Sequence, residues 1–553
     1  MADLSFHHGV RVFESGETPA LFRIDQTAVV IVYGTAPNAD PILWPYNEPV
    51  LLKGSAAQAL SLGVAGTLKS AIDGIFDQHG AYVFVVRVEE GGTPAETLSN
   101  LVGDQAAMTG VWAALKCEPK FALKPRIAIV PGFTASTPAD GIASITIANQ
   151  GVGYQSTPTI TLTGGNGAGA TAEAVFADGK VTGAIIRRAG AGYTLAPAVV
   201  ISGGGSGAAA TATLTGGAVT AIAVTQGGAG YVTPPAVTIT GDGEGAEAVA
   251  VLAGGVVTAI TVTEGGGDYT EATVSIAGGS LAAGVAVIGN VANPVVAELD
   301  AVLSRVRAVA FVDGPDTTDE AAVAYRGLLN SQRIYVIDPK VLVWDTQEDA
   351  YVPQPASPRF AGVQCMVDRT LGFWWSVSNK PIKGIGGVTR PVTYGDQANY
   401  LNERAVNTII NRSGTGFRTW GNRVATADSL WRFLPVRRTA DFINEAIEET
   451  YLEFVDRPFS LANLKHLLES GRAGMRTLQN NGAILGGNVW APSDMNTDAQ
   501  MAAGIYYVAV DFEPPAPMED IRVPAYRNIS YYAVLRDRAL TEIADGSLTG
   551  AAA

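Results

Sequence analysis

The sequence predicts an α+β / α/β multidomain chain, in which an α/β body is interrupted by an inserted all-β repeat domain. Three observations predict this class. Apolar strand-like runs alternate with helical segments before residue 141 and again after residue 281, as in a partly parallel sheet covered by helices. Between them, one motif recurs with a period of about 38 residues, which indicates a repeat architecture. Hydrophobic residues make up 47% of the chain and charged residues only 16%, so every part can bury a core.

The N-terminal part predicts an extended arm, residues 1–30, followed by the first part of the α/β body, residues 31–141. An apolar run lies near the terminus, where a strand needs a sheet edge to join, so we expect it to dock on another subunit. This run is Val10, Arg11, Val12 and Phe13. Buried strands are predicted at 27–33, 82–88 and 126–130, and helices at 56–62 and 67–77.

The repeat domain is predicted to fill residues 142–280. Its landmarks are tyrosines that close glycine-containing turns, spaced 39, 38 and 38 residues apart: Tyr154, Tyr193, Tyr231 and Tyr269. The glycine-rich loops between them predict tight turns in which glycine supplies a positive φ. The last unit reads as incomplete and ends near Ser280, which gives three and a half units. Because the α/β pattern resumes afterwards, we expect an insertion at a surface loop.

The remaining chain divides into the second part of the α/β body, residues 281–345, an inner domain, residues 346–515, and a C-terminal arm, residues 516–553. Two helices are predicted at 439–455 and 460–479. The second carries three cations that spacings of seven and four residues place on one face: Lys465, Arg472 and Arg476. A terminal strand is predicted at 528–535, with Ile529, Tyr531, Ala533 and Leu535 along it.

Composition and motifs exclude several functions. A net charge of −15 argues against binding to nucleic acid or an anionic membrane, which requires a basic patch. No secretory signal and no apolar window of membrane-spanning length occurs. The cysteines, Cys117 and Cys365, indicate buried apolar side chains. The four histidines form no metal-ligand set, and no nucleophile or phosphate-loop motif occurs. We therefore expect no metal, no cofactor and no enzymatic activity.

Several segments outside the repeat resemble the tail sheath proteins of contractile-tailed bacteriophages. In the first half they are SFHHGVRVFE at 5–14, RVEEGG at 87–92, KPRIAIVPG at 124–132 and VLVWDT at 341–346. In the second half they are FWWSVSNKPIKGIGGVTRPV at 373–392, YLNERAVNTIINRSGTGFRTWGNR at 400–423, DRP at 456–458 and IYYVAVDFEPPAPMEDI at 505–521. The inserted repeat departs from the short members of this family.

The resemblance implies a structural subunit that polymerises as hexameric rings in a helical sheath around a tail tube. It implies contraction from a metastable extended state, which drives the tube through the host envelope, and it implies baseplate and tail terminator partners. The terminal arms would add strands to a sheet of neighbouring subunits. The same resemblance makes Lys465, Arg472 and Arg476 candidates for contacting the tube. The implied location is the virion tail sheath, assembled in the host cytoplasm.

Two alternatives remain open. The chain is equally compatible with the sheath of a phage-derived bacteriocin or another contractile injection system. The other alternative is a different class of protein, a glycan-binding surface protein that acts through the β repeats. Exposed aromatic side chains on the repeat face would favour this alternative.

Overall fold

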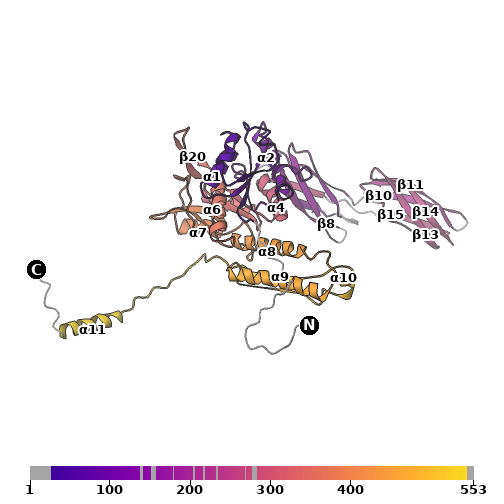
Figure 1. The fold of residues 1–553 in the computed structure, drawn as a ribbon. Coiled ribbons are helices and arrows are strands. Elements are labelled where there is room, and N and C mark those ends of the chain that lie inside the picture. Colours follow the sequence, from indigo (N-terminus) through magenta and orange to yellow (C-terminus); the bar gives the residue numbers. More distant parts are fainter. Residues whose placement is uncertain are drawn as a thin grey trace, which may run out of the picture. The chain divides into compact units, whose positions relative to one another are not determined.

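The computed structural model describes most of the chain (Figure 1). The described residues are 26–137, 141–150, 157–177, 180–192, 194–202, 206–215, 218–231, 234–267, 270–276, 283–289 and 291–544. They fall into two compact units, Met1–Ala516 and Pro517–Ala553. The predicted N-terminal strand Val10–Phe13 lies outside the described residues.

One eight-stranded sheet forms the body, in the order β2-β3-β1-β4-β17-β18-β22-β23. Its strands are β1 (Val29–Gly34), β2 (Val50–Lys53), β3 (Tyr82–Arg87), β4 (Ile127–Ile129), β17 (Val309–Asp313), β18 (Ile334–Ile337), β22 (Val406–Arg412) and β23 (Gly416–Trp420). The edge strands β2 and β23 are antiparallel to their neighbours, and the other six strands are parallel. β4, before the repeat region, pairs with β17, after it. The prediction that the α/β pattern resumes across an insertion is therefore confirmed.

Helices cover both faces of this sheet, which explains why its central strands are apolar throughout. Val30 and Val32 of β1 point into a core shared with α1 (Leu68–Phe76) and α6 (Ser357–Thr370). Val29 and Ile31 point into the opposite core, which contains side chains of α2 (Pro94–Val102), η2 (Gly110–Lys116) and α4 (Pro294–Val306). Figure 1 shows α1 and α6 on one side of the body and α2 and α4 on the other. Further short helices are η1 (Ala56–Leu62), α3 (Cys117–Phe121) and α5 (Asp319–Gly327).

The sheet extends past the predicted domain boundary at residue 345. β22 and β23 lie in the segment assigned to the inner domain, yet they continue the body sheet because the buried β22 pairs in parallel with β18. The boundary also falls within the hairpin of β19 (Val341–Asp345) and β20 (Ala350–Gln354), to which β21 (Gly387–Val388) is added. The helix α7 (Asp396–Glu403) precedes β22.

The C-terminal part of the first unit is a small layer of helices against a hairpin. Its elements are α8 (Leu434–Leu452), α9 (Leu461–Asn480), β24 (Gly486–Trp490), α10 (Asp498–Ala502) and β25 (Ala509–Glu513). α8 and α9 run side by side (Figure 1), and Phe442 and Ile443 of α8 share a core with Met475 and Leu478 of α9. The two helices predicted from the sequence are confirmed, with shifted ends.

Strands fill the described part of the inserted region. They are β5 (Gly141–Asn149), β6 (Thr159–Thr163), β7 (Ala168–Ala177), β8 (Lys180–Ala191), β9 (Ala198–Ser202), β10 (Ser206–Thr215), β11 (Ala218–Ala229), β12 (Val237–Gly241), β13 (Glu244–Ala253), β14 (Val256–Gly267), β15 (Ala272–Ile276) and β16 (Ala283–Gly289). One sheet has the order β5-β16-β9-β6-β7-β8, a second has the order β10-β11-β14-β13, and β12 pairs with β15. Gly164 and Gly165, between β6 and β7, have φ of 78° and 79°, as expected of turn glycines.

Strand structure continues beyond Ser280, so the reading of an incomplete last unit is wrong. β16 pairs antiparallel with β5, the first strand of the insertion, with Gly289 opposite Gly141. The sequence obscured this strand because a glycine-rich stretch separates it from β15. Of the landmark tyrosines, Tyr231 is 6% exposed, while Tyr154, Tyr193 and Tyr269 lie outside the described residues.

The second unit contains α11 (Tyr531–Ala544), so the prediction of a terminal strand at 528–535 is wrong for the isolated chain. The apolar and aromatic composition of this stretch favours a strand, but a strand needs a partner for its backbone groups. A helix satisfies them within the segment, and Arg538 pairs with Glu542 four residues on, at 2.9 Å. No residue of α11 is buried.

Candidate functional site

The three cations predicted to contact a tube all lie on α9. Lys465 and Arg476 are exposed and Arg472 is half-buried, so the face predicted from their spacing is accessible. Arg472 Nε donates to the carbonyl oxygen of Val489 at 2.9 Å, which ties this side chain to β24. The opposite side of α9 packs into the core with α8 and holds the helix in place.

Sequence reasoning missed an acidic residue in this face. Glu469 pairs with Arg472 at 2.9 Å and lies 3.7 Å from Arg476. Its position four residues after Lys465 and three before Arg472 was a sufficient signal, because such spacings bring helical side chains together. The face is therefore mixed in charge, with one carboxylate among three cations.

α8 carries carboxylates that point at the body rather than at solvent. Glu445 accepts from Arg126 and lies 2.5 Å from Lys124, which precede β4. Asp441 pairs with Arg333 at 2.5 Å and with Arg437 at 2.7 Å. These contacts place α8 against the amino ends of β4 and β18. Local sequence patterns do not indicate the contacts of Glu445 with Arg126 and of Asp441 with Arg333, because these partners are more than 100 residues apart.

The pKa shifts in this network follow from burial and pairing. Burial opposes the charge of Lys124, but hydrogen bonding and attraction from Glu445 and Glu118 outweigh it and raise the pKa of Lys124. A hydrogen bond from Arg307 lowers the pKa of Glu448. Burial lowers the pKa of Arg437 despite the neighbouring Asp441. Further along α8, Arg438 and Asp368 form a buried pair at 2.6 Å and 2.7 Å.

The predicted arm residues of the second unit are exposed. Ile529, Tyr531 and Leu535 are 71%, 73% and 62% exposed, and Ala533 is also exposed. The preceding stretch adds Met518, Ile521 and Val523, each at least 71% exposed. Such a density of exposed apolar side chains is typical of an interaction segment.

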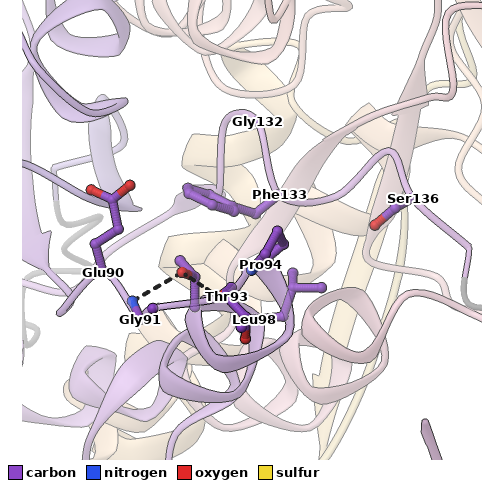
Figure 2. A pocket seen from close by; sticks show the side chains of 10 residues that line it. Glu90, Gly91, Thr93, Pro94, Leu98, Gly132, Phe133 and Ser136 are labelled. Atoms are coloured by element: carbon purple, nitrogen blue, oxygen red, sulfur yellow. Dashed lines mark hydrogen bonds between the residues drawn. The ribbon is translucent and has the colours of Figure 1, made fainter. Parts of the chain in front are cut away.

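A hollow of about 380 Å³ lies at the carboxyl ends of β3 and β4. Figure 2 shows it between the loop from Glu90 to Pro94 and the turn that carries Phe133. The N-terminus of α2 is already capped by the side chain of Thr93, which accepts from Glu96 N. Nothing in this hollow has the arrangement of a nucleophile and a base.

Within the described ranges, no group of three or more His, Cys, Asp or Glu side chains is arranged to hold a metal ion. Among the helices of the described residues, none is both long and apolar enough to cross a bilayer. Cys117 and Cys365 are buried free thiols, as predicted, and burial raises the pKa of Cys117 to about 12.

Comparison with known proteins finds phage tail sheath domains in the C-terminal half of the chain. Residues 263–425 match the phage tail sheath protein central domain, and residues 426–526 match the phage tail sheath C-terminal domain. Over these residues the chain is similar to phage tail sheath proteins. The junction of the two matches, at residues 425 and 426, follows the last strand of the body sheet.

Individual sheath relatives span different parts of the chain. A putative prophage major tail sheath protein of Pseudomonas aeruginosa (strain UCBPP-PA14) is 39% identical over 252 residues, which are 45% of this chain and 63% of that protein. The tail sheath protein of Escherichia phage P2 is 29% identical over 532 residues, covering 93% of this chain and 94% of that protein. The sheath of an extracellular contractile injection system, solved in its contracted state, shares the fold with a TM-score of 0.53 at 15% identity, covering 96% of this chain and all of that one.

Proposed function

We propose that this chain is the structural subunit of a contractile phage tail sheath. The observation that carries the proposal is the match to the phage P2 tail sheath protein over nearly the full length of both chains. The likeness in fold to a contracted sheath supports an architecture suited to the same assembly. In this proposal, copies polymerise as hexameric rings around a tail tube, between a baseplate and a tail terminator. Contraction from a metastable extended state then drives the tube through the host envelope.

The terminal arms connect neighbouring subunits in this proposal. Val10, Arg11, Val12 and Phe13 at one end, and Ile529, Tyr531, Ala533 and Leu535 at the other, add strands to sheets of adjacent copies. Support comes from α11, whose apolar side chains are exposed and are not buried against any other part of the chain. Its composition favours a strand, and the edge of a sheet in a neighbouring copy supplies the backbone hydrogen-bond partners that the isolated segment lacks. The helix is the form of the unassembled arm.

The α9 face contacts the tail tube in this proposal. Lys465 and Arg476 are exposed, and Arg472 is held at the same face by Val489. The presence of Glu469 among them favours a tube surface that carries both signs of charge.

The inserted region is an all-β repeat domain with a period of about 38 residues that decorates the sheath. Corresponding strands support this: β7, β10 and β13 begin at Ala168, Ser206 and Glu244, and β8, β11 and β14 begin at Lys180, Ala218 and Val256. Pairing of β5 with β16 joins the last strand of the insertion to its first strand. Passive decoration is also favoured by Tyr231, which packs inside and is not available to stack on a glycan.

The subunit acts mechanically and not as an enzyme, and it belongs to the virion tail after assembly in the host cytoplasm. Electron microscopy of the purified protein in negative stain tests the proposal. We expect hollow sleeves or stacked rings at high protein concentration. A monodisperse monomer at every concentration and ionic strength would contradict it. A bacteriocin sheath would form the same sleeves, and neighbouring genes for a capsid distinguish the two.

A further inference from the structure

A basic pocket of about 440 Å³ lies at the end of the body sheet where its parallel strands begin. It lies beside the amino ends of β18 and β22, because Ala405 precedes β22 and Ala425 N donates to Ile334 O, the first residue of β18. Four guanidinium groups and two carboxylates line it, from Arg326, Arg404, Arg423, Arg432, Glu403 and Asp428. This excess of positive charge stands out on a chain whose net charge is −15.

Local structure accounts for the positions of Arg326 and Arg404, and the buried Nε of Arg326 has no hydrogen-bond partner among the described residues. Arg326 is in the last turn of α5 and Arg404 caps α7, and cations are favoured at helix C-termini. Arg326 donates to Thr426 O at 2.9 Å, and burial without a compensating carboxylate lowers the pKa of Arg326. Arg404 pairs with Glu403, which is 73% exposed, and such a pair is weak in water. A carboxylate entering the pocket would gain charge-assisted hydrogen bonds.

The carboxyl edge of the same sheet carries an exposed acidic loop, Glu89 and Glu90, directly after β3. The loop backbone is fixed to α2, because Asn100 Nδ2 donates to Glu89 O at 3.1 Å and Gly91 N donates to Thr97 Oγ1 at 3.0 Å. Figure 2 shows the Glu90 carboxylate standing away from Pro94 and Leu98. Neither carboxylate forms an ion pair with another residue in the part of the chain that the structure describes.

We propose that the arginine pocket of one copy binds the Glu89–Glu90 loop of a second copy. The inference rests on the self-assembly proposed above and names one of its contacts. Parallel strands put the two groups at opposite edges of one sheet, so the contact is heterologous and repeats along a polymer without closing on itself. It also offers local attraction between chains that repel each other through their net charge.

The test is a charge-swap series scored by the critical concentration for sleeve formation, measured by sedimentation at low and at high salt. We expect R404E/R432E and E89K/E90K each to raise this concentration by roughly tenfold or more at low salt, with a smaller effect at high salt. Combining all four substitutions in one chain restores assembly to near the wild-type value. All four residues are exposed, so the variants keep the monomer fold, and thermal melting of the monomers checks this. K53E, at another exposed cation, is the matched control.

The outcomes separate this inference from the proposed function. Wild-type assembly with no effect of either double substitution would overturn the contact and leave the sheath function intact. An effect of the arginine substitutions without an effect of the glutamate substitutions, or without rescue by the combination, would overturn the Glu89–Glu90 loop as the occupant. Failure of the wild type to form sleeves would overturn the proposed function itself.

Discussion

The guanidinium of Arg126, one residue before β4, donates to the carboxylate of Glu445 in α8, across 319 residues of sequence. Their side chains are 2% and 4% exposed. The pair therefore fixes the C-terminal helical layer to the amino edge of the body sheet. In a contracting sheath, such a link makes the layer that carries α9 move together with the body.

Breaking this pair should destabilise the first unit strongly. E445Q keeps the shape of the side chain but removes the negative charge that faces the buried Arg126 and one of the two carboxylates that pair with Lys124. We expect a loss of about 3–5 kcal/mol in the free energy of unfolding, measured with urea. The control is E453Q, at the exposed end of the same helix, with an expected change within about 0.5 kcal/mol. Equal effects of the two substitutions would contradict the account.

Stability should depend on pH through Asp313, the last residue of β17. Burial raises the pKa of Asp313 to about 6, although its carboxylate accepts from Ser357 N, Ser357 Oγ and Ala356 N at 2.5–2.8 Å. The folded state therefore binds this proton more tightly than the unfolded state does. Protonation of Asp313 therefore raises the free energy of unfolding by about 3 kcal/mol in all as the pH falls from about 7 to about 4.

The measurement is the urea unfolding free energy between pH 7 and pH 4 for the wild type, D313N and E448Q. D313N should lose the gain in stability at low pH. Arg307 lowers the pKa of Glu448, so the wild type loses the stability of this pair as the pH falls. E448Q should therefore remove a loss of stability at low pH, whereas D313N removes a gain. The same pH profile for the wild type and D313N would show that Asp313 does not titrate in this range.

Removal of the C-terminal arm should abolish assembly without affecting the body. Truncation after Ala516 removes α11, which buries no side chain within the chain. We expect an unchanged melting temperature for the first unit and no sleeves by sedimentation or microscopy. L535D is the corresponding point substitution, and R536E on the same helix is its control. Sleeves formed by the truncated chain would exclude a role for the arm in connecting subunits.

How far the sequence predicts the fold depends on whether the signal is local. α4 has a local signal at its start, because Asn293 caps it, Pro294 begins it, and apolar residues recur at helical spacing. α6 was missed because it is buried almost all round, including Arg359 at 2% exposed, and therefore lacks an apolar stripe. The pairing of Arg126 with Glu445 has no local signal at all. At the candidate tube contact, spacing identified three cations, while Glu469 was overlooked in the same face.

Charge reversal on α9 should separate polymerisation from tube binding. K465E/R476E changes two exposed cations that take no part in the core of the helical layer. We expect sleeves to form normally but to contain no tubes when tube protein is added, scored by co-sedimentation. K53E is again the control. Normal coating of tubes by the double variant, at any salt concentration, would exclude this face as the tube contact.

The inserted region should be dispensable for assembly. Gly141 and Gly289 face each other in the pairing of β5 with β16, so a short glycine-serine linker can replace residues 142–288 without moving the flanking body. We expect this variant to form sleeves with the same critical concentration as the full chain. Loss of polymerisation in a variant that still melts like the wild-type body would place the repeat domain in the lattice.

The most direct test of the sheath account uses intact tails that contain this chain. Tails are imaged by electron microscopy before and after a contraction trigger such as urea, with gold-labelled antibody against the purified protein. The account predicts label along the whole tail and, after triggering, a shorter and wider labelled sleeve from which an unlabelled tube of unchanged length protrudes. Label confined to one end of the tail, or a labelled sleeve whose length does not change when the tube is exposed, would contradict it.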